Sequence, residues 1–84
     1  MATVKLTSGA AKQLDRLQEP THGRVLKVLK RLESWPGVSG VKALSGNLAG
    51  WYRARAGDHR VRFRVDGDAL IVDKIGLPRD FYED

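Results

Sequence analysis

The sequence predicts an α+β fold, in which one strand and two helices precede three further strands. Two patterns support this prediction. Apolar residues recur every three or four positions in the first half of the chain, as in helices, and at alternate positions in the second half, as in strands. Glycine and proline separate these segments. We therefore expect a single domain over residues 1–84, with both helices packed on one face of a sheet.

The first strand is expected at residues 3–6, where Val4 and Leu6 alternate with polar side chains. Thr7 or Ser8 is suited to cap the helix that follows, because a hydroxyl oxygen accepts a hydrogen bond from a free backbone N–H. This first helix ends before Pro20. Its apolar positions are Ala10, Ala11, Leu14 and Leu17.

The second helix is expected from Pro20 to about Trp35. Proline suits a first helical position because its missing N–H would have no partner there, and Pro36 and Gly37 end the helix. Since the connection between the helices is short, they should form an antiparallel hairpin. Its buried stripe is expected to consist of Val25, Val28, Leu29, Leu32 and Trp35.

The second half of the chain predicts a loop followed by a meander of strands. Glycines and few strand signals mark residues 38–50 as a loop. We expect the helical hairpin to return the chain, so that the first two strands run in opposite directions. Tight hairpin turns are expected at Gly57-Asp58 and Asp66-Gly67-Asp68. The three strands are expected at about residues 51–56, 59–65 and 69–75.

Arginine occupies nearly every second position from Trp51 to Val65. Because side chains of a strand alternate between its two faces, these arginines should gather on one side of the sheet. A shift of one residue would bury them, which the desolvation of charge opposes. The side chains expected on this open face are Trp51, Arg53, Arg55, Arg60, Arg62 and Arg64, and those expected to face the helices are Val61, Phe63 and Val65.

The charge of the chain suggests an acidic partner. The formal net charge is +5, and the excess is grouped in the arginine segment and in the second helix. The planar guanidinium matches the geometry of phosphate. The chain has no cysteine, which excludes disulfides, cysteine nucleophiles and cysteine-ligated zinc. No apolar run approaches the roughly 20 residues that cross a bilayer, so we expect no membrane contact and a cytoplasmic location.

Two segments of the sequence resemble a known family. The run Leu44-Ser45-Gly46 and residues 50–61, GWYRARAGDHRV, resemble the LxG…YRxRxGdyR signature of the bacterial RelE/ParE toxin superfamily. Residues 74–82, KIGLPRDFY, resemble its IGHRxxxY tail, although Leu77 and Pro78 replace the basic pair of that tail. The resemblance implies a four-stranded antiparallel sheet with a helical hairpin on one face. It also implies a toxin of a type II toxin–antitoxin system.

The RelE-like members of this superfamily cut messenger RNA in the ribosomal A site. The resemblance therefore implies an endoribonuclease that needs no metal and no cofactor. Arg60 matches the arginine that holds the scissile phosphate, and Tyr82 matches a tyrosine that stacks on a base or assists proton transfer. The implied catalytic residues are Arg53, Arg55, Arg60, Arg79 and Tyr82. The expected RNA-binding residues are Trp51, Arg62, Arg64 and Lys42, with coverage of the edge of the core as the alternative role for Trp51.

Metal-free cleavage proceeds by in-line attack of the 2′-hydroxyl on the adjacent phosphate. Arginines can stabilise the charge that develops on the phosphorane, but they are poor bases because they remain protonated. Tyr82 is therefore a candidate for proton transfer. Alternation places His59 on the face with Val61, where we expect a packed and hydrogen-bonded imidazole.

The altered tail leaves alternative functions open. ParE-like members of the superfamily inhibit DNA gyrase without cleaving RNA, and an inactive toxin would serve only to bind its antitoxin. The expected partners are a small acidic antitoxin encoded beside the chain, the ribosome and messenger RNA. Operator DNA is expected to be bound only through the antitoxin complex.

Overall fold

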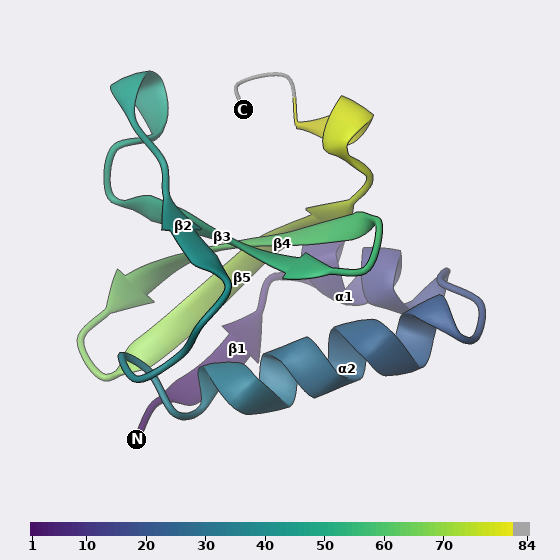
Figure 1. Cartoon of the computed structure of the whole chain (residues 1–84), viewed down its shortest axis with the longest axis horizontal. Coiled ribbons are helices and arrows are strands. Elements are labelled where there is room, and N and C mark those ends of the chain that lie inside the picture. Colours follow the sequence, from purple (N-terminus) through teal and green to yellow (C-terminus); the bar gives the residue numbers. More distant parts are fainter. Residues whose placement is uncertain (82–84) are drawn as a thin grey trace.

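The computed structural model describes residues 1–81, which form two α-helices and a five-stranded sheet (Figure 1). Two short 3₁₀ turns, η1 and η2, lie before β3 and after β5. In chain order the elements are β1 (Thr3–Leu6), α1 (Ser8–Asp15), α2 (Thr21–Leu32), β2 (Val41–Ala43), η1 (Gly46–Leu48), β3 (Trp51–Ala56), β4 (His59–Asp66), β5 (Ala69–Gly76) and η2 (Pro78–Asp80).

The sheet has the strand order β1-β5-β4-β3-β2. All neighbouring strands are antiparallel except β1 and β5, which are parallel. The predicted α+β class with its helical hairpin is confirmed, but the expectation of four antiparallel strands is wrong. The sheet is mixed, and its fifth strand is β2, which lies inside the segment predicted to be a loop.

The short strand β2 escaped prediction because it has only three residues, too few for a clear alternating pattern. It is held by pairing rather than by its own sequence, since its residues lie opposite Ala54, Arg53 and Tyr52 of β3. β2 also takes the returning direction that was expected for β3. As a result, β1 and β3 run in the same direction, contrary to the prediction.

The ends of the helices follow their capping residues. The Thr7 Oγ1 atom accepts a hydrogen bond from the Ala10 N–H at 3.2 Å, which confirms the predicted cap of α1. α2 ends at Leu32, three residues earlier than predicted. The chain continues in turns, in which the Trp35 N–H donates to the Leu32 carbonyl at 3.0 Å. Trp35 still packs against the core, as expected, because the turns keep it beside the sheet.

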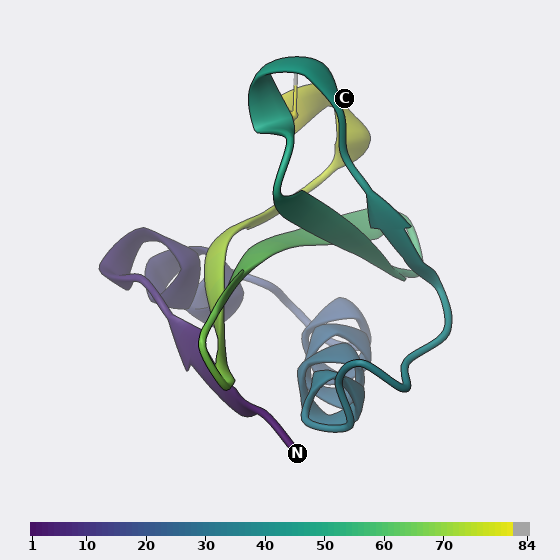
Figure 2. The same cartoon turned by 90° about the vertical axis from the view of Figure 1, so that its left-hand side faces the viewer.

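The hydrophobic core lies between the helices and one face of the sheet. Figure 2 shows both helices on this side and both 3₁₀ turns on the other. Val61 and Phe63 are fully buried, as predicted, but Val65 is 38% exposed because it lies beside the turn that joins β4 to β5. The largest fully buried side chains are Phe63, Leu32, Leu70, Val25, Val61 and Val72.

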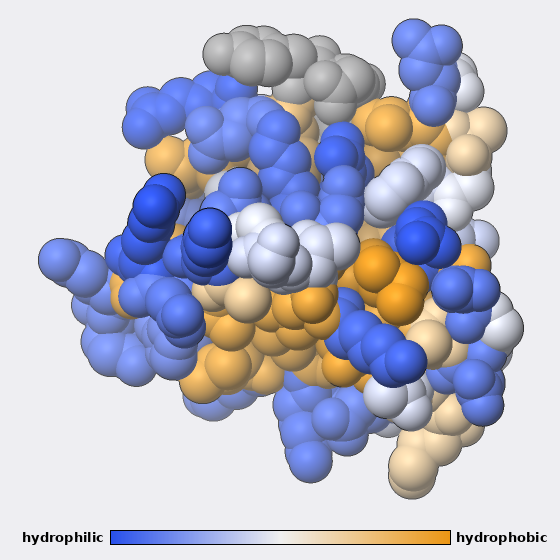
Figure 3. Space-filling model, turned by 180° about the vertical axis from the view of Figure 1, so that it is seen from behind, coloured by the Kyte–Doolittle hydropathy of each residue, from blue (hydrophilic) through white to orange (hydrophobic). Residues whose placement is uncertain are grey.

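The surface seen from behind the view of Figure 1 is mixed in character. From behind, an apolar area crosses the middle of the molecule and is bordered by hydrophilic side chains (Figure 3). Leu26 of α2 and Met1 at the N-terminus are large apolar side chains that are exposed to solvent. Within residues 1–81, no helix combines the length and apolar character needed to span a membrane.

Candidate nucleic-acid interface

Basic side chains form cross-strand rows on the face of the sheet opposite the helices. Directly paired residues share a face of the sheet and have Cβ atoms about 4.5–5.5 Å apart. One row therefore brings together Lys42, Arg53, Arg62 and Lys74 from four neighbouring strands. A second row pairs Arg55 with Arg60, and a third pairs Trp51 with Arg64. We call this surface the arginine face: Lys42, Trp51, Arg53, Arg55, Arg60, Arg62, Arg64 and Lys74.

The arginine face lies between two projections of the chain. η1 and η2 both rise on the side away from the helices (Figures 1 and 2). At the β3–β4 turn, Arg60 is half-buried, and its Nη1 atom donates to the carbonyls of Asp58 and His59 at 3.4 and 3.3 Å. Arg53 is also half-buried, whereas Arg55 is exposed. The face thus combines half-buried arginines with exposed ones.

Arg62 is held by a carboxylate of the same face. Its Nε atom donates to Asp73 Oδ1 at 3.0 Å, and its Nη2 atom donates to Asp73 Oδ2 at 2.7 Å. The two side chains are only 14% and 22% exposed. This paired, two-bond geometry is the strong form of an ion pair. We expected Arg62 to bind RNA. In the structure its positive charge is offset by the carboxylate of Asp73.

A β-bulge brings Asp73 to this position. Arg62 lies opposite Lys74, whereas Phe63 lies opposite Val72, so Asp73 is the extra residue of β5. The Ile75 N–H donates to the Gln13 Oε1 atom at 2.7 Å, which ties this part of β5 to α1. Two adjacent polar residues, Asp73 and Lys74, break the alternation of the predicted strand. That break was the one sequence signal for the bulge.

Trp51 supports two of the arginines. The guanidinium carbons of Arg62 and Arg64 lie 5.2 and 6.0 Å from the centre of its ring. Such cation–π contacts are worth about 0.5–1 kcal/mol at exposed sites. Because Trp51 is half-buried, its ring serves as a platform for these side chains at the edge of the arginine face.

The C-terminal segment returns to the arginine face through Phe81, a residue that the sequence analysis did not single out. After Gly76, the chain turns through η2, and Phe81 becomes buried at 3% exposure. The Lys74 Nζ atom lies 5.2 Å from the Phe81 ring centre, and the guanidinium carbon of Arg62 lies 5.9 Å from it. Phe81 therefore covers the β5 end of the basic row.

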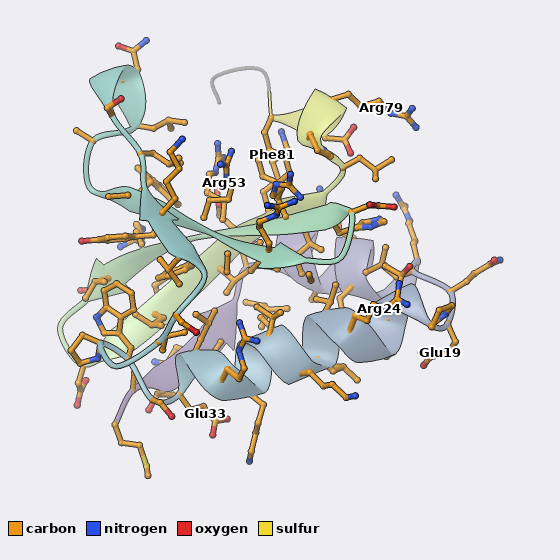
Figure 4. All side chains as sticks on the ribbon, in the orientation of Figure 1. Glu19, Arg24, Glu33, Arg53, Arg79 and Phe81 are labelled. Carbon is orange, nitrogen blue, oxygen red and sulfur yellow. The ribbon has the colours of Figure 1, made fainter. Side chains whose placement is uncertain are left out.

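The remaining predicted site residues are less closely grouped. Arg79 is exposed and points away from Arg53 and Phe81 (Figure 4), because η2 turns its side chain outwards. The structure thus does not bring Arg79 together with Arg53. Tyr82 lies outside the described residues. Lys42 and Arg64 lie on the face as expected and are exposed.

The histidine at the β3–β4 turn does not share the arginine face, because it alternates with Arg60. His59 lies opposite Ala56 beside the β3–β4 turn. Its Nδ1 atom is buried and has no hydrogen-bond partner among residues 1–81, so the expected hydrogen bond is not found at that nitrogen. In the same residues, no group of three or more histidine and acidic side chains is arranged to hold a metal ion.

The fold and the family of the chain are known from comparison with other proteins. The fold is similar to that of a chain in the RelBE2 toxin–antitoxin complex from Mycobacterium tuberculosis, at 24% identity and a TM-score of 0.78 over 90% of this chain and 96% of that one. A YoeB/ParE toxin from Agrobacterium tumefaciens is similar at 18% identity and a TM-score of 0.74, over 89% and 96% of the two chains.

An archaeal RelE–RelB complex from Pyrococcus horikoshii matches at 28% identity and a TM-score of 0.74, over 90% of this chain and 93% of that one. No curated protein sequence gives a match. The model of the family described as the ParE toxin of type II toxin–antitoxin system, parDE, matches residues 4–77. This match covers most of the chain and confirms the resemblance seen in the motifs. The chain belongs to the ParE toxin family of type II toxin–antitoxin systems.

Proposed function

We propose that this toxin is a ribosome-dependent endoribonuclease that cleaves messenger RNA on its arginine face. The observation that carries the proposal is the row of basic side chains, Lys42, Arg53, Arg62 and Lys74, across four strands. Within this row, Arg62 forms an ion pair with Asp73. Repulsion within such a surface favours a polyanionic ligand, and the flanking projections suit a single strand.

The proposed chemistry uses the 2′-hydroxyl of the RNA as the nucleophile. Arg53 and Arg60 would hold the scissile phosphate and stabilise the negative charge that grows on its oxygens. Their half-buried positions reduce the reorganisation that this requires. Arg55, which is exposed, would bind a neighbouring phosphate. Stabilisation of this kind can supply several kcal/mol, since removing one donor from a comparable site costs about 2.7–4 kcal/mol.

The proton transfer steps need a group other than arginine. Both carboxylate oxygens of Asp73 already accept hydrogen bonds from Arg62. Tyr82 thus remains our candidate for this role, as the sequence resemblance implies. Arg79 is left out of the proposed phosphate site because its side chain points away from it.

We also propose that an acidic antitoxin, encoded beside this chain, covers the arginine face. The Mycobacterium tuberculosis structure is of a toxin–antitoxin complex. An acidic segment would be complementary to the charge of the arginine face. Contact with operator DNA would then be made through the antitoxin complex.

The proposal is tested by the cleavage rate of ribosome-bound messenger in a reconstituted translation reaction. Arg53→Ala and Arg60→Ala are expected to lower the rate by about 10²–10³-fold each, because each removes a charge at the phosphate. Arg16→Ala is the matched control, since Arg16 is exposed and lies on the helical side. Equal rates for Arg53→Ala and Arg16→Ala would refute the assignment.

Inhibition of DNA gyrase is the second candidate function. It is favoured by the family model, which describes ParE toxins, and by a tail whose basic residue Arg79 is directed away from the arginine face. In this case the wild-type chain would block supercoiling by gyrase and leave ribosome-bound messenger intact. A supercoiling reaction that is unaffected by excess protein would exclude this candidate.

A further inference from the structure

The segment after β5 forms a closed turn. The Asp80 Oδ2 atom accepts a hydrogen bond from the Leu77 N–H at 2.8 Å. The Asp80 N–H donates to the Leu77 carbonyl at 2.8 Å, and the Phe81 N–H donates to the Pro78 carbonyl at 3.0 Å. These bonds reverse the chain within a few residues and bring Phe81 back over the sheet.

The Asp80 carboxylate fits against the backbone of Gly76. A Cβ atom added at Gly76 would lie 2.7 Å from Asp80 Oδ2 and 3.3 Å from both Asp80 Cβ and Cγ. The φ angle of Gly76 is not in the left-handed region, unlike those of Gly57 and Gly67. At Gly76 a side chain is therefore opposed by contact with the Asp80 side chain and not by backbone conformation. A side chain at this position would push Asp80 out of the turn.

The closed turn determines where Phe81 lies. The ring is 3% exposed and lies within cation–π distance of both Lys74 and Arg62. Arg62 is itself held by Asp73 from the bulge of β5. The tail is thus attached to a part of the sheet whose side chains are already fixed, one strand away from Arg53.

We propose that Asp80 is a positioning residue for the cleavage reaction. Its carboxylate closes the turn, and the turn holds Phe81 on Lys74 and Arg62 beside the phosphate-binding arginines. Asp80 acts through this contact and does not touch the RNA, since its carboxylate is directed at the Leu77 N–H. The inference rests on the proposed function, and its structural part is measurable without RNA.

The structural part is tested by hydrogen exchange of the Leu77 amide, measured by NMR on the isolated chain. Asp80→Ala is expected to speed this exchange about tenfold, because it removes the acceptor of the Leu77 N–H. Asp80→Asn keeps an oxygen acceptor and should exchange within about threefold of wild type. Gly76→Ala leaves the carboxylate in place but displaces it, so its exchange should resemble that of Asp80→Ala.

Asp15→Ala is the matched control, because Asp15 is an exposed carboxylate at the end of α1. In the Asp15→Ala variant, the Leu77 amide should exchange at the wild-type rate. Wild-type exchange in both Asp80→Ala and Gly76→Ala would overturn the proposal, since the carboxylate would then not close the turn.

The functional part is tested by kcat and KM for cleavage of ribosome-bound messenger. Asp80→Ala should lower kcat about tenfold and leave KM within about twofold, and Asp80→Asn should restore kcat. If Asp80 acts through Phe81, adding Asp80→Ala to Phe81→Ala should have no further effect. Additive losses, or an opened turn with unchanged kcat, would overturn the positioning role. If the wild-type chain does not cleave messenger, the proposed function and this role both fail, while the exchange data still decide whether Asp80 closes the turn.

Discussion

The ion pair between Arg62 and Asp73 is expected to be a main determinant of stability on the arginine face. Replacing Asp73 by alanine removes two hydrogen bonds and the carboxylate that offsets the charge of Arg62. A hydrogen bond to a charged group contributes about 1.5–3 kcal/mol, and breaking a fully buried ion pair costs about 3–5 kcal/mol. Because these side chains are 14% and 22% exposed, solvent offsets part of the loss.

We therefore expect Asp73→Ala to lower the free energy of unfolding by about 2 kcal/mol. In a domain of this size that corresponds to a decrease in Tm of about 8–16 °C. The measurement is urea unfolding followed by tryptophan fluorescence, with an unchanged m value as the sign that only stability has changed. The double mutant cycle with Arg62→Ala should give a coupling energy of similar size.

Asp66→Ala provides the matched control for this prediction. Asp66 pairs with Arg64 at 3.9 Å, and their side chains are 68% and 44% exposed, so its loss should cost less than about 0.5 kcal/mol. The reasoning is refuted if Asp73→Ala is no more destabilising than Asp66→Ala. It is also refuted if the coupling energy between Arg62 and Asp73 is zero within error.

Three further predictions follow from the core, the helix cap and the charge of the face. Phe63→Ala should destabilise the chain by about 3–5 kcal/mol in urea unfolding, because the ring is fully buried; a loss of about 0.5 kcal/mol or less, as for an ordinary surface substitution, would contradict the core assignment. Thr7→Ala should cost about 1 kcal/mol, since Ala10 loses its side-chain acceptor, and Thr7→Ser should recover most of it. Arg55→Ala should reduce the salt dependence of single-stranded RNA binding by about 0.7 in log–log slope, measured by fluorescence anisotropy; an unchanged slope would show that Arg55 makes no phosphate contact.

The predictable parts of the fold are the segments in which apolar residues recur regularly over many positions. The alternation around Val61 and Phe63 identified the buried face of β4 and, with it, the open face of the arginines. The stripe from Val25 to Leu32 identified the buried face of α2. These patterns are local consequences of burial, so the sequence alone carries them.

The parts that were not predictable depend on tertiary contacts. β2 is too short to show a period and exists through its pairing with β3. The parallel pairing of β1 with β5 joins the two ends of the sequence, for which no local pattern exists. The path of the tail depends on the fit of Asp80 against Gly76, which spacing in the sequence does not encode.

The candidate site was predicted in part for the same reason. Alternation placed Arg53, Arg55 and Arg60 on one face, but it did not reveal that a bulge would bring Asp73 to Arg62. Nor did it reveal that Phe81 would cover Lys74. The resemblance to the toxin family supplied the expectation for Arg79, which the geometry of η2 directs away from the face.

The most direct test of the account is to map new RNA 5′ ends in a translation reaction that contains a defined messenger and the purified, antitoxin-free chain. The account predicts cuts in the messenger that appear only when ribosomes are present and that disappear in Arg60→Ala. An intact messenger in the presence of ribosomes and wild-type protein would contradict it, and the arginine face would then serve to bind a protein partner.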